Sequence, residues 1–281
     1  MKKVVFNADD FGRHSAINQA VRQGVEEGVL TSASLMPGEG AFGEAAEIAR
    51  SLPGLEVGVH LTLVDAVPVS DPARIPSLVD GEGRFRANHK EFVKSYFAGK
   101  IDLQEVALEL KAQIDRVAGE HLRLTHVDGH QHIHILSGIL PIVLALAKEA
   151  GIGAVRIPRV DVNADTGKSQ GGLGEMVGRL GLWTLASAGM YKARKTGFAV
   201  PEHFAGLVAG TAADEDYVLK LLPVLPEGTT EIMTHPGLDN GVLKEVCGWD
   251  HDFEAEYKAI VSPKVREAME KLGIGTGSFA E

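Results

Sequence analysis

The sequence predicts an α/β fold in which about seven parallel strands form a barrel or an incomplete barrel. Two observations lead to this prediction. Segments typical of strands and of helices alternate along the 281 residues, and the hydrophobic content of 44% is ample for a large core. Repeated alternation implies parallel strands joined by right-handed crossovers. The length would also allow two small domains, but we expect a single catalytic barrel domain over residues 1–281.

The expected strands are short apolar and β-branched runs bounded by turn-forming residues. They cover residues 3–7, 31–36, 55–63, 123–127, 153–157, 204–208 and 229–234, with a further one near 273–276. The expected helices place apolar residues on one face at helical spacing. They lie near residues 14–27, 41–52, 102–119, 137–150, 213–222 and 254–271.

Two longer segments, residues 64–88 and 158–203, interrupt the alternation after strand ends, and the second contains a helix-like stretch that includes Leu180, Trp183 and Met190. Long loops at that place usually shape specificity, so we expect both to be insertions on the rim of the barrel. Arg156 and Arg159 flank the start of the second segment. They could hold a polar group of a substrate, or they could be exposed charges or structural ion pairs.

The most informative stretch lies between residues 126 and 134, where a histidine or an aspartate occupies every second position. If this stretch is extended, these side chains all face the same way, because the faces of a strand alternate with period two. Imidazole is a common metal ligand, and a nearby carboxylate can orient a ligand ring. The pattern therefore predicts a metal site, although a His-rich polar edge would look similar. The side chains are those of His126, Asp128, His130, His132 and His134.

A pair of adjacent carboxylates, Asp9 and Asp10, follows the first expected strand. The carboxyl end of a strand is the usual place for chemistry in an α/β protein. Adjacent carboxylates repel, so one tends to stay neutral or to take a cation. One aspartate on a metal and one as a general base is a natural division. Alternatively, Asp10 or Ser15 merely caps the following helix.

Two further histidines stand within or at the end of expected strands. His60 lies inside the run Val57–Leu63, where a lone histidine is more often a hydrogen-bonded core residue than a ligand. His235 ends a late strand and is followed at once by a Pro-Gly turn. Both would reach the same rim as Asp9 in a parallel barrel.

Composition narrows the function classes. A net charge of −10 argues against a nucleic-acid-binding protein. Cys247 is the only cysteine, which excludes a disulfide framework and a thiolate metal cluster. We find neither a signal-peptide pattern nor an apolar run of transmembrane length, so we expect a cytoplasmic protein that is not an integral membrane protein.

Three motifs together resemble the YdjC-like carbohydrate deacetylases. They span residues 7–12, 58–61 and 126–134, in the order and spacing of that family. Residues 28–36, 156–159 and 231–237 are most similar to its hopanoid-biosynthesis-associated branch. The resemblance implies a distorted TIM-type barrel, often a homodimer, that removes acetyl groups from N-acetylated sugars with a divalent metal.

The resemblance also implies roles for single residues. Asp9 would be the general base, and Asp10, His60 and His130 would bind the metal. Gly129 and Gln131 stand where other members carry Ser and His, so the roles of His132 and His134 stay open, as substrate contacts or as supports behind the ligands.

The expected chemistry extends this set. His235 is our candidate acid for the leaving amine, and Asp128 would orient His235 or a ligand ring. One ion is expected; zinc suits the donor set by softness, and magnesium also accepts carboxylate.

The predicted function is hydrolysis of the N-acetyl group of an amino sugar. The substrate would be a chito-oligosaccharide or a glucosamine attached to a hopanoid lipid. Two other classes stay open: another metal-dependent amidohydrolase or phosphoesterase on a similar barrel, and a metal- or sugar-binding protein without catalysis. A second metal, for which His132 and His134 could supply ligands, would favour the first of these classes.

Overall fold

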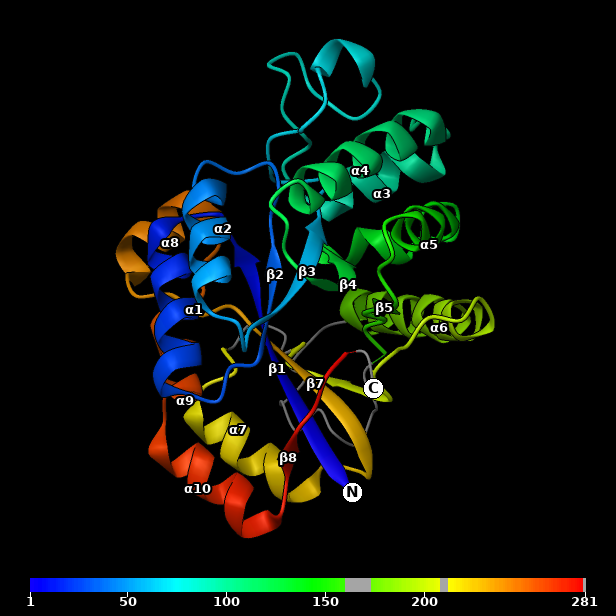
Figure 1. The fold of residues 1–281 in the computed structure, drawn as a ribbon. Coiled ribbons are helices and arrows are strands. Elements are labelled where there is room, and N and C mark those ends of the chain that lie inside the picture. The colour runs from blue at the N-terminus through cyan, green and yellow to red at the C-terminus, as the bar shows by residue number, and fades with distance from the viewer. Residues whose placement is uncertain (160–172, 208–211, 280–281) are drawn as a thin grey trace.

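The computed structural model describes residues 1–159, 173–207 and 212–279, and it has an α/β architecture with one curled parallel sheet (Figure 1). The sheet path runs β5-β4-β3-β2-β1-β7-β6, and β8 pairs with β1 outside this path. Every strand pair is parallel. The prediction of an incomplete TIM-type barrel of about seven parallel strands is therefore confirmed. The strands are β1 (Lys2–Phe11), β2 (Ser32–Leu35), β3 (Glu56–Leu61), β4 (Leu124–Gly129), β5 (Ala154–Val155), β6 (His203–Ala205), β7 (Gly228–Thr234) and β8 (Gly275–Thr276).

The sheet is curled but does not close into a complete ring. Its path ends in β5 on one side and β6 on the other. Ala199, a few residues before β6, donates its N–H to the carbonyl of Gly153 at 2.9 Å and accepts the N–H of Val155 at 3.0 Å. This short pairing draws the two ends of the sheet toward each other.

Helices cover the outside of the curled sheet, as Figure 1 shows. The helices lie close to the predicted places, with additional ones at α3 and α8. They are α1 (Ser15–Glu27), α2 (Phe42–Ser51), α3 (His89–Phe97), α4 (Leu103–Ala118), α5 (Leu140–Glu149), α6 (Leu173–Lys195), α7 (Glu215–Leu221), α8 (Asn240–Cys247), α9 (Phe253–Ile260) and α10 (Pro263–Leu272), with short 3₁₀ turns η1 (Pro72–Arg74), η2 (His130–Ile135) and η3 (Leu222–Val224).

The single helix expected over residues 254–271 is wrong, because two helices meet there. Ser262 caps the second helix, and its Oγ accepts the N–H of Lys264 at 3.2 Å. Pro263 has no N–H to give to a continuing helix, so it suits the first position of a new one.

Both segments predicted to be rim insertions contain described residues. Residues 64–88 form a loop region with η1 and the isolated bridges Val64–Arg86 and Val79–Phe85. The predicted insertion over 158–203 contains α6, and its residues 160–172 lie outside the described part of the chain.

The cap of α1 answers one question that the sequence left open. The N-cap is His14, whose Nδ1 accepts the N–H of Ala16 at 3.1 Å. Neither Asp10 nor Ser15 caps this helix. Asp9 and Asp10 are instead the buried final part of β1, and they need another explanation.

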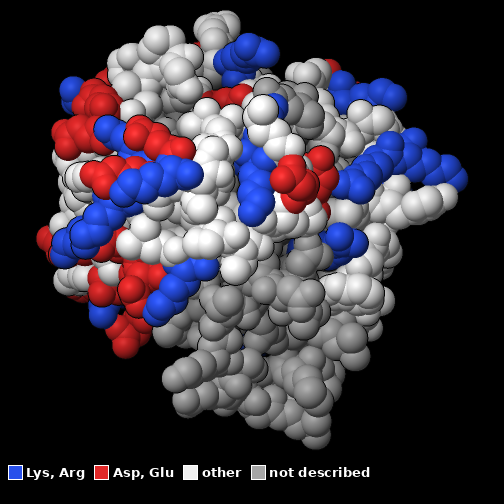
Figure 2. All heavy atoms as spheres, turned by 90° about the horizontal axis from the view of Figure 1, so that it is seen from below, with Lys and Arg blue, Asp and Glu red and all other residues white. Residues whose placement is uncertain are grey.

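The surface carries charges of both signs close together. Figure 2 shows them intermingled on the side where α7, α9 and α10 lie in Figure 1. Exposed pairs such as Lys258–Glu254 and Lys271–Glu267 contribute to this pattern. Among the residues that the structure describes, no helix has the length and apolarity needed to cross a bilayer.

Candidate metal centre

Three strand ends bring the predicted ligands and their supports together. Asp9 and Asp10 come from the end of β1, and His60 from the end of β3. Asp128 lies near the end of β4, and His130 follows it directly in η2. The carboxyl ends of parallel strands meet at one rim, which explains why residues so distant in sequence become neighbours.

Asp10, His60 and His130 face one another at the centre of this group. Asp10 Oδ1 lies 3.0 Å from His130 Nδ1 and 3.4 Å from His60 Nε2. One donor atom of each residue lies within 4.8 Å of the other two. Asp10 Oδ1 and His60 Nε2 are buried yet form no hydrogen bond of acceptable geometry. Buried polar atoms without partners are rare, so this trio fits a divalent cation.

The electrostatics of the trio also favour a cation. Burial alone would raise the pKa of Asp10, but His130, His60 and Arg13 together hold the pKa well below its usual value. Burial alone would lower the pKa of His60, but the charges of Asp128 and Asp9 raise the pKa to about 10. The surrounding carboxylates therefore stabilise positive charge at the place where the two side chains meet.

Strained backbone concentrates at this rim. Five described non-glycine residues have positive φ, and four of them lie here. Such residues cost of order 1–3 kcal/mol each and cluster at functional sites. The four are Asp10 (φ 61°), Asp65 (φ 50°), Gln131 (φ 50°) and His132 (φ 58°).

His60 is held by a carboxylate on its far side. Its Nδ1 donates to Asp128 Oδ1 at 2.8 Å, which leaves Nε2 to face Asp10. A carboxylate behind a histidine in this way fixes the tautomer and raises the basicity of a metal ligand. This hydrogen bond fits the suggestion that Asp128 orients a ligand ring.

His130 has two neighbours that the sequence did not indicate. Its Nε2 lies 3.4 Å from Asp65 Oδ2 and 3.4 Å from Arg13 Nη1. Arg13 in turn pairs with Asp65 at 3.0 Å. The sequence did contain a clue to both residues, because Arg13 and Asp65 each stand a few residues beyond a strand that carries a candidate ligand.

Arg156 is fully buried behind the trio and forms ion pairs, one of the three roles that the sequence left open. Its guanidinium binds Asp9 through two bonds, of 2.6 and 2.7 Å. It also lies 2.8 Å from Asp128 and 2.5 Å from Glu231. Burial, helped by the charges of Asp9 and Asp128, raises the pKa of Glu231 to about 8 in spite of Arg156. The guanidinium of Arg156 thus orients both Asp9, the predicted base, and Asp128, the carboxylate behind His60.

A further buried residue, Ser34 of β2, links these groups and was not predicted. Its Oγ donates to Asp128 Oδ2 at 2.7 Å and accepts from Asn7 Nδ2 at 2.9 Å. Asn7 also donates to Asp9 Oδ1 at 2.8 Å. The orientation of both aspartates is therefore fixed by hydrogen bonds as well as by charge.

The extended stretch that would place five side chains on one face ends at Gly129. Gln131 and His132 take left-handed backbone angles, so η2 turns away from the strand. His134 Nε2 donates to the carbonyl of Arg156 at 2.9 Å. His132 packs edge-on against Phe204, with ring centroids 6.0 Å apart. Burial lowers the pKa of His134 to about 4, which keeps this histidine neutral.

The first histidine of the stretch is part of the core. His126 stacks on Phe279 at 3.6 Å, and its Nε2 lies 3.1 Å from Ser34 Oγ. Burial lowers the pKa of His126 to about 3. Only Asp128 and His130 of this stretch therefore contact the candidate ligands directly.

His235 follows β7 and is mostly buried. Its backbone N–H donates to Glu256, and its ring lies edge-on to Trp249 at 5.0 Å. Burial lowers the pKa of His235, while the charges of Glu256, Asp9 and Asp10 oppose this shift. The carboxylates of Glu256, Asp9 and Asp10 thus favour the protonated form of His235, against the effect of burial.

Two other trios bring potential donors within 4.8 Å: Asp9, His60 and Asp128, and His235, His251 and Glu256. The first already holds the guanidinium of Arg156. In the second, Glu256 accepts backbone N–H groups from His235 and Ala213. We therefore consider Asp10, His60 and His130 the best candidate for a metal.

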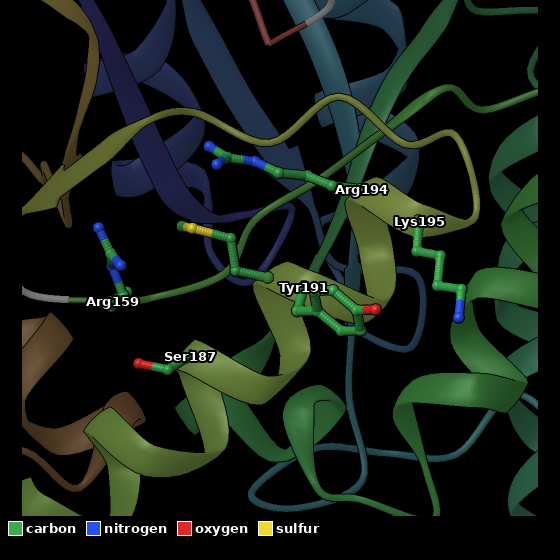
Figure 3. A pocket seen from close by; sticks show the side chains of 6 residues that line it. Arg159, Ser187, Tyr191, Arg194 and Lys195 are labelled. Carbon is green, nitrogen blue, oxygen red and sulfur yellow. The ribbon is translucent and has the colours of Figure 1, made fainter.

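Arg159 lies elsewhere, on a cavity of about 370 Å³ beside α6 (Figure 3). Among the described residues, the lining consists of Arg159, Ser187, Met190, Tyr191, Arg194 and Lys195. In Figure 3, Lys195 points away from the side on which Arg159 lies. The candidate ligands are not part of this lining.

The chain is similar to several known proteins. A family model described as YdjC-like protein matches residues 3–271. The carbohydrate deacetylase of Brevibacillus brevis is 42% identical over 156 residues, which cover 56% of this chain and 59% of that protein. The chitooligosaccharide deacetylase of Yersinia pestis is 30% identical over 284 residues, which cover 100% of this chain and 99% of that protein.

A solved structure is similar along the whole chain. It is a candidate cellobiose-phosphate cleavage protein of Enterococcus faecalis V583, with a TM-score of 0.74 and 30% identity. The superposition covers 99% of this chain and 97% of that one. With the family model matching residues 3–271, the chain belongs to the YdjC-like family.

Proposed function

We propose that this protein is a metal-dependent deacetylase that hydrolyses the acetamide of an N-acetylated amino sugar. The observation that carries the proposal is the arrangement of Asp9 beside Asp10, His60 and His130. Three residues offer donors to one ion, and a fourth carboxylate stands next to them, held by Arg156. Simple metal binding would not need this additional base.

The donor set fits one divalent ion, zinc or magnesium. Two imidazoles and one carboxylate leave coordination positions open, as a catalytic site requires. When bound, such an ion polarises the acetamide carbonyl and lowers the pKa of water. Zinc accepts imidazole more readily, whereas magnesium prefers oxygen donors.

Asp9 is the proposed general base. Its Oδ2 lies 4.0 Å from His60 Nε2, on the side of the candidate ligands. Asp9 Oδ1 accepts bonds from Arg156 and Asn7, whereas Oδ2 accepts one bond, from Arg156, and keeps a lone pair that can take a proton from the attacking water. The same bonds fix the carboxylate in one orientation, as efficient proton transfer requires.

His235 is the proposed acid that protonates the leaving nitrogen. Its position after β7 puts the ring on the rim of Asp9 and Asp10, whose charges act on it. His235 is not one of the proposed metal ligands. Its backbone N–H donates to Glu256, which is not one of them either.

The proposed substrate is a chito-oligosaccharide, because a relative matched over its whole length carries that activity in its name. A glucosamine attached to a hopanoid lipid stays a prediction from the motif resemblance, as do a cytoplasmic location and a homodimer. Both substrates present the same N-acetyl group, so the proposed chemistry is identical.

The test is acetate release from N,N′-diacetylchitobiose and from an N-acetylglucosaminyl lipid, with metal content measured on the same sample. Chelation should abolish turnover, and either zinc or magnesium should restore it. Acetate release with about one ion per chain supports the proposal. Two ions per chain with hydrolysis of a phosphate ester, and no acetate, would favour the phosphoesterase instead.

A further inference from the structure

An exposed aromatic ring stands beside the proposed acid. Helix α8 ends at Cys247, and Gly248 turns the chain with a φ of 59°. The next residue, Trp249, is 42% exposed although its ring packs edge-on against His235 at 5.0 Å. This tryptophan is thus both in contact with the proposed acid and accessible from solvent.

The indole of Trp249 is supported on one face by His251. One face stacks on His251, with ring centroids 3.8 Å apart and an angle of 18° between the planes. His251 is buried, and its Nε2 lies 2.9 Å from Oε1 of Glu256. The same Glu256 accepts the backbone N–H of His235. One buried carboxylate thus positions both the proposed acid and the support of the indole.

The end of α8 also lies close to the candidate ligands. Burial raises the pKa of the Cys247 thiol to about 12, and the charges of Arg13, Asp10 and Asp65 act on the same thiol. Cys247 is two residues from Trp249. A substrate group that reaches His235 would lie close to the Trp249 ring, whose centroid is 5.0 Å from that of His235.

We propose that Trp249 is the platform on which a pyranose ring of the substrate packs, next to the acetamide that is cleaved. The C–H groups of a sugar form an apolar face, and a rigid aromatic side chain offers a large contact area at a low cost in conformational entropy. Because His251 covers one face of the indole, the remaining exposed part is available for this contact. The inference rests on the proposed function, since it assumes a carbohydrate substrate.

The chain has two tryptophans, which allows a direct optical test. The other is Trp183 of α6, which is 45% exposed and serves as the matched control. In Trp183→Phe, the fluorescence of Trp249 should change saturably when N,N′-diacetylchitobiose is added. In Trp249→Phe, which leaves Trp183, the same titration should cause no change.

Kinetics provide the second measurement. Trp249→Ala should raise KM for the disaccharide roughly 10-fold, the ratio that corresponds to about 1.4 kcal/mol of lost contact. The value of kcat should change little, and Trp249→Phe should recover part of the affinity. A fall in kcat with unchanged KM would overturn the inference, because Trp249 would then act only by supporting His235.

The outcomes separate this inference from the proposed function. The protein could release acetate although Trp249→Ala leaves KM unchanged and the fluorescence of Trp249 does not respond to the saccharide. That result would overturn the platform and leave the proposed deacetylase activity intact. A saturable fluorescence response without acetate release would support the platform and overturn the deacetylase. If the fluorescence of Trp249 changed with protein concentration and not with saccharide, the platform would be overturned, since Trp249 would then pack against a second copy of the chain.

Discussion

His60 donates a hydrogen bond of 2.8 Å from Nδ1 to Asp128, while its Nε2 faces Asp10 at 3.4 Å. The two nitrogens of one ring thus connect a supporting carboxylate to a candidate ligand. Asp128 is itself held by Arg156 and by Ser34. The orientation of His60 therefore depends on a network that reaches Asp9 through the same arginine.

The first prediction concerns Asp128. Asp128→Asn keeps the size of the side chain but removes the negative charge behind His60. Metal affinity should fall roughly 10–100-fold, the usual effect of losing a carboxylate behind a histidine ligand. Competition with a chromophoric chelator measures this change. The control is Asp115→Asn, which alters an exposed aspartate paired with Lys111 on α4. Equal affinities in both variants would contradict the prediction.

The second prediction is that His60 and His130 bind the ion. His60→Ala and His130→Ala should each lose most of the bound metal while the circular dichroism spectrum stays native, because each removes a donor of the trio. Elemental analysis of the purified variants measures the occupancy. His121→Asn is a suitable control, since His121 is exposed and Asn tolerates its φ of 56°. Full occupancy in either alanine variant would refute the assignment.

The third prediction concerns the pH dependence of stability. The pKa of Glu231 in the folded protein is about 8, above its ordinary value of 4.5. Between these values the folded protein holds a proton that the unfolded chain has released. The stabilisation from this proton is present below about pH 4.5 and is lost as the pH rises toward 8.

Glu231→Gln should therefore become more stable relative to the parent as the pH rises from 5 to 8. The difference should grow by at most about 1.4 kcal/mol per pH unit. Urea unfolding at several pH values, at a fixed metal concentration, measures it. Glu245→Gln, at an exposed position of α8, should give no such trend. Parallel stability curves for the parent and Glu231→Gln would show that Glu231 is ionised in the folded state.

Strands and most helices could be predicted because their patterns are local. The run Val4–Phe6 is buried as expected. The apolar residues of α4 at helical spacing, Val106, Leu110, Ile114 and Val117, are buried too, whereas Leu103 at the start of the helix is 39% exposed. The helices α3 and α8 were not predicted, since each is only a few turns long and its apolar pattern is short. The break at Pro263 was readable in principle from Ser262, whose hydroxyl is a typical N-cap.

The candidate site was only partly predictable, for a physical reason. Strand ends and metal-binding residue types make Asp10, His60 and His130 candidates, and the family resemblance implies that these three bind the ion. Partners such as Ser34 and Glu256 depend on which strands and helices become neighbours, and that is a tertiary property. The turn at Gln131 likewise contradicts the alternating pattern, because the backbone takes a strained conformation that sequence periodicity does not indicate.

The fourth prediction is that Asp9 is the base. Asp9→Asn preserves the shape of the side chain but cannot accept the proton of the attacking water. The metal content should stay near that of the parent, while turnover should fall by roughly 10²-fold or more. Acetate release and elemental analysis on the same preparation check both statements. Near-normal turnover in this variant would exclude Asp9 as the base.

The fifth prediction concerns His235, whose ring lies outside the trio. His235→Ala should lower kcat strongly, because the leaving nitrogen would lack its proton donor, and should leave the metal content unchanged. His251→Ala serves as a comparison, since it removes the stacked neighbour of Trp249 without removing the proposed acid. It should affect KM more than kcat.

A substrate with a better leaving group sharpens this test. An aryl acetate releases a phenolate that needs little protonation, so His235→Ala should cleave it at a rate close to that of the parent. The loss of activity should appear only with the acetamide. If the variant loses the same factor with both substrates, His235 does not act as the acid. A loss of metal in the same variant would instead make His235 part of the binding site for the ion.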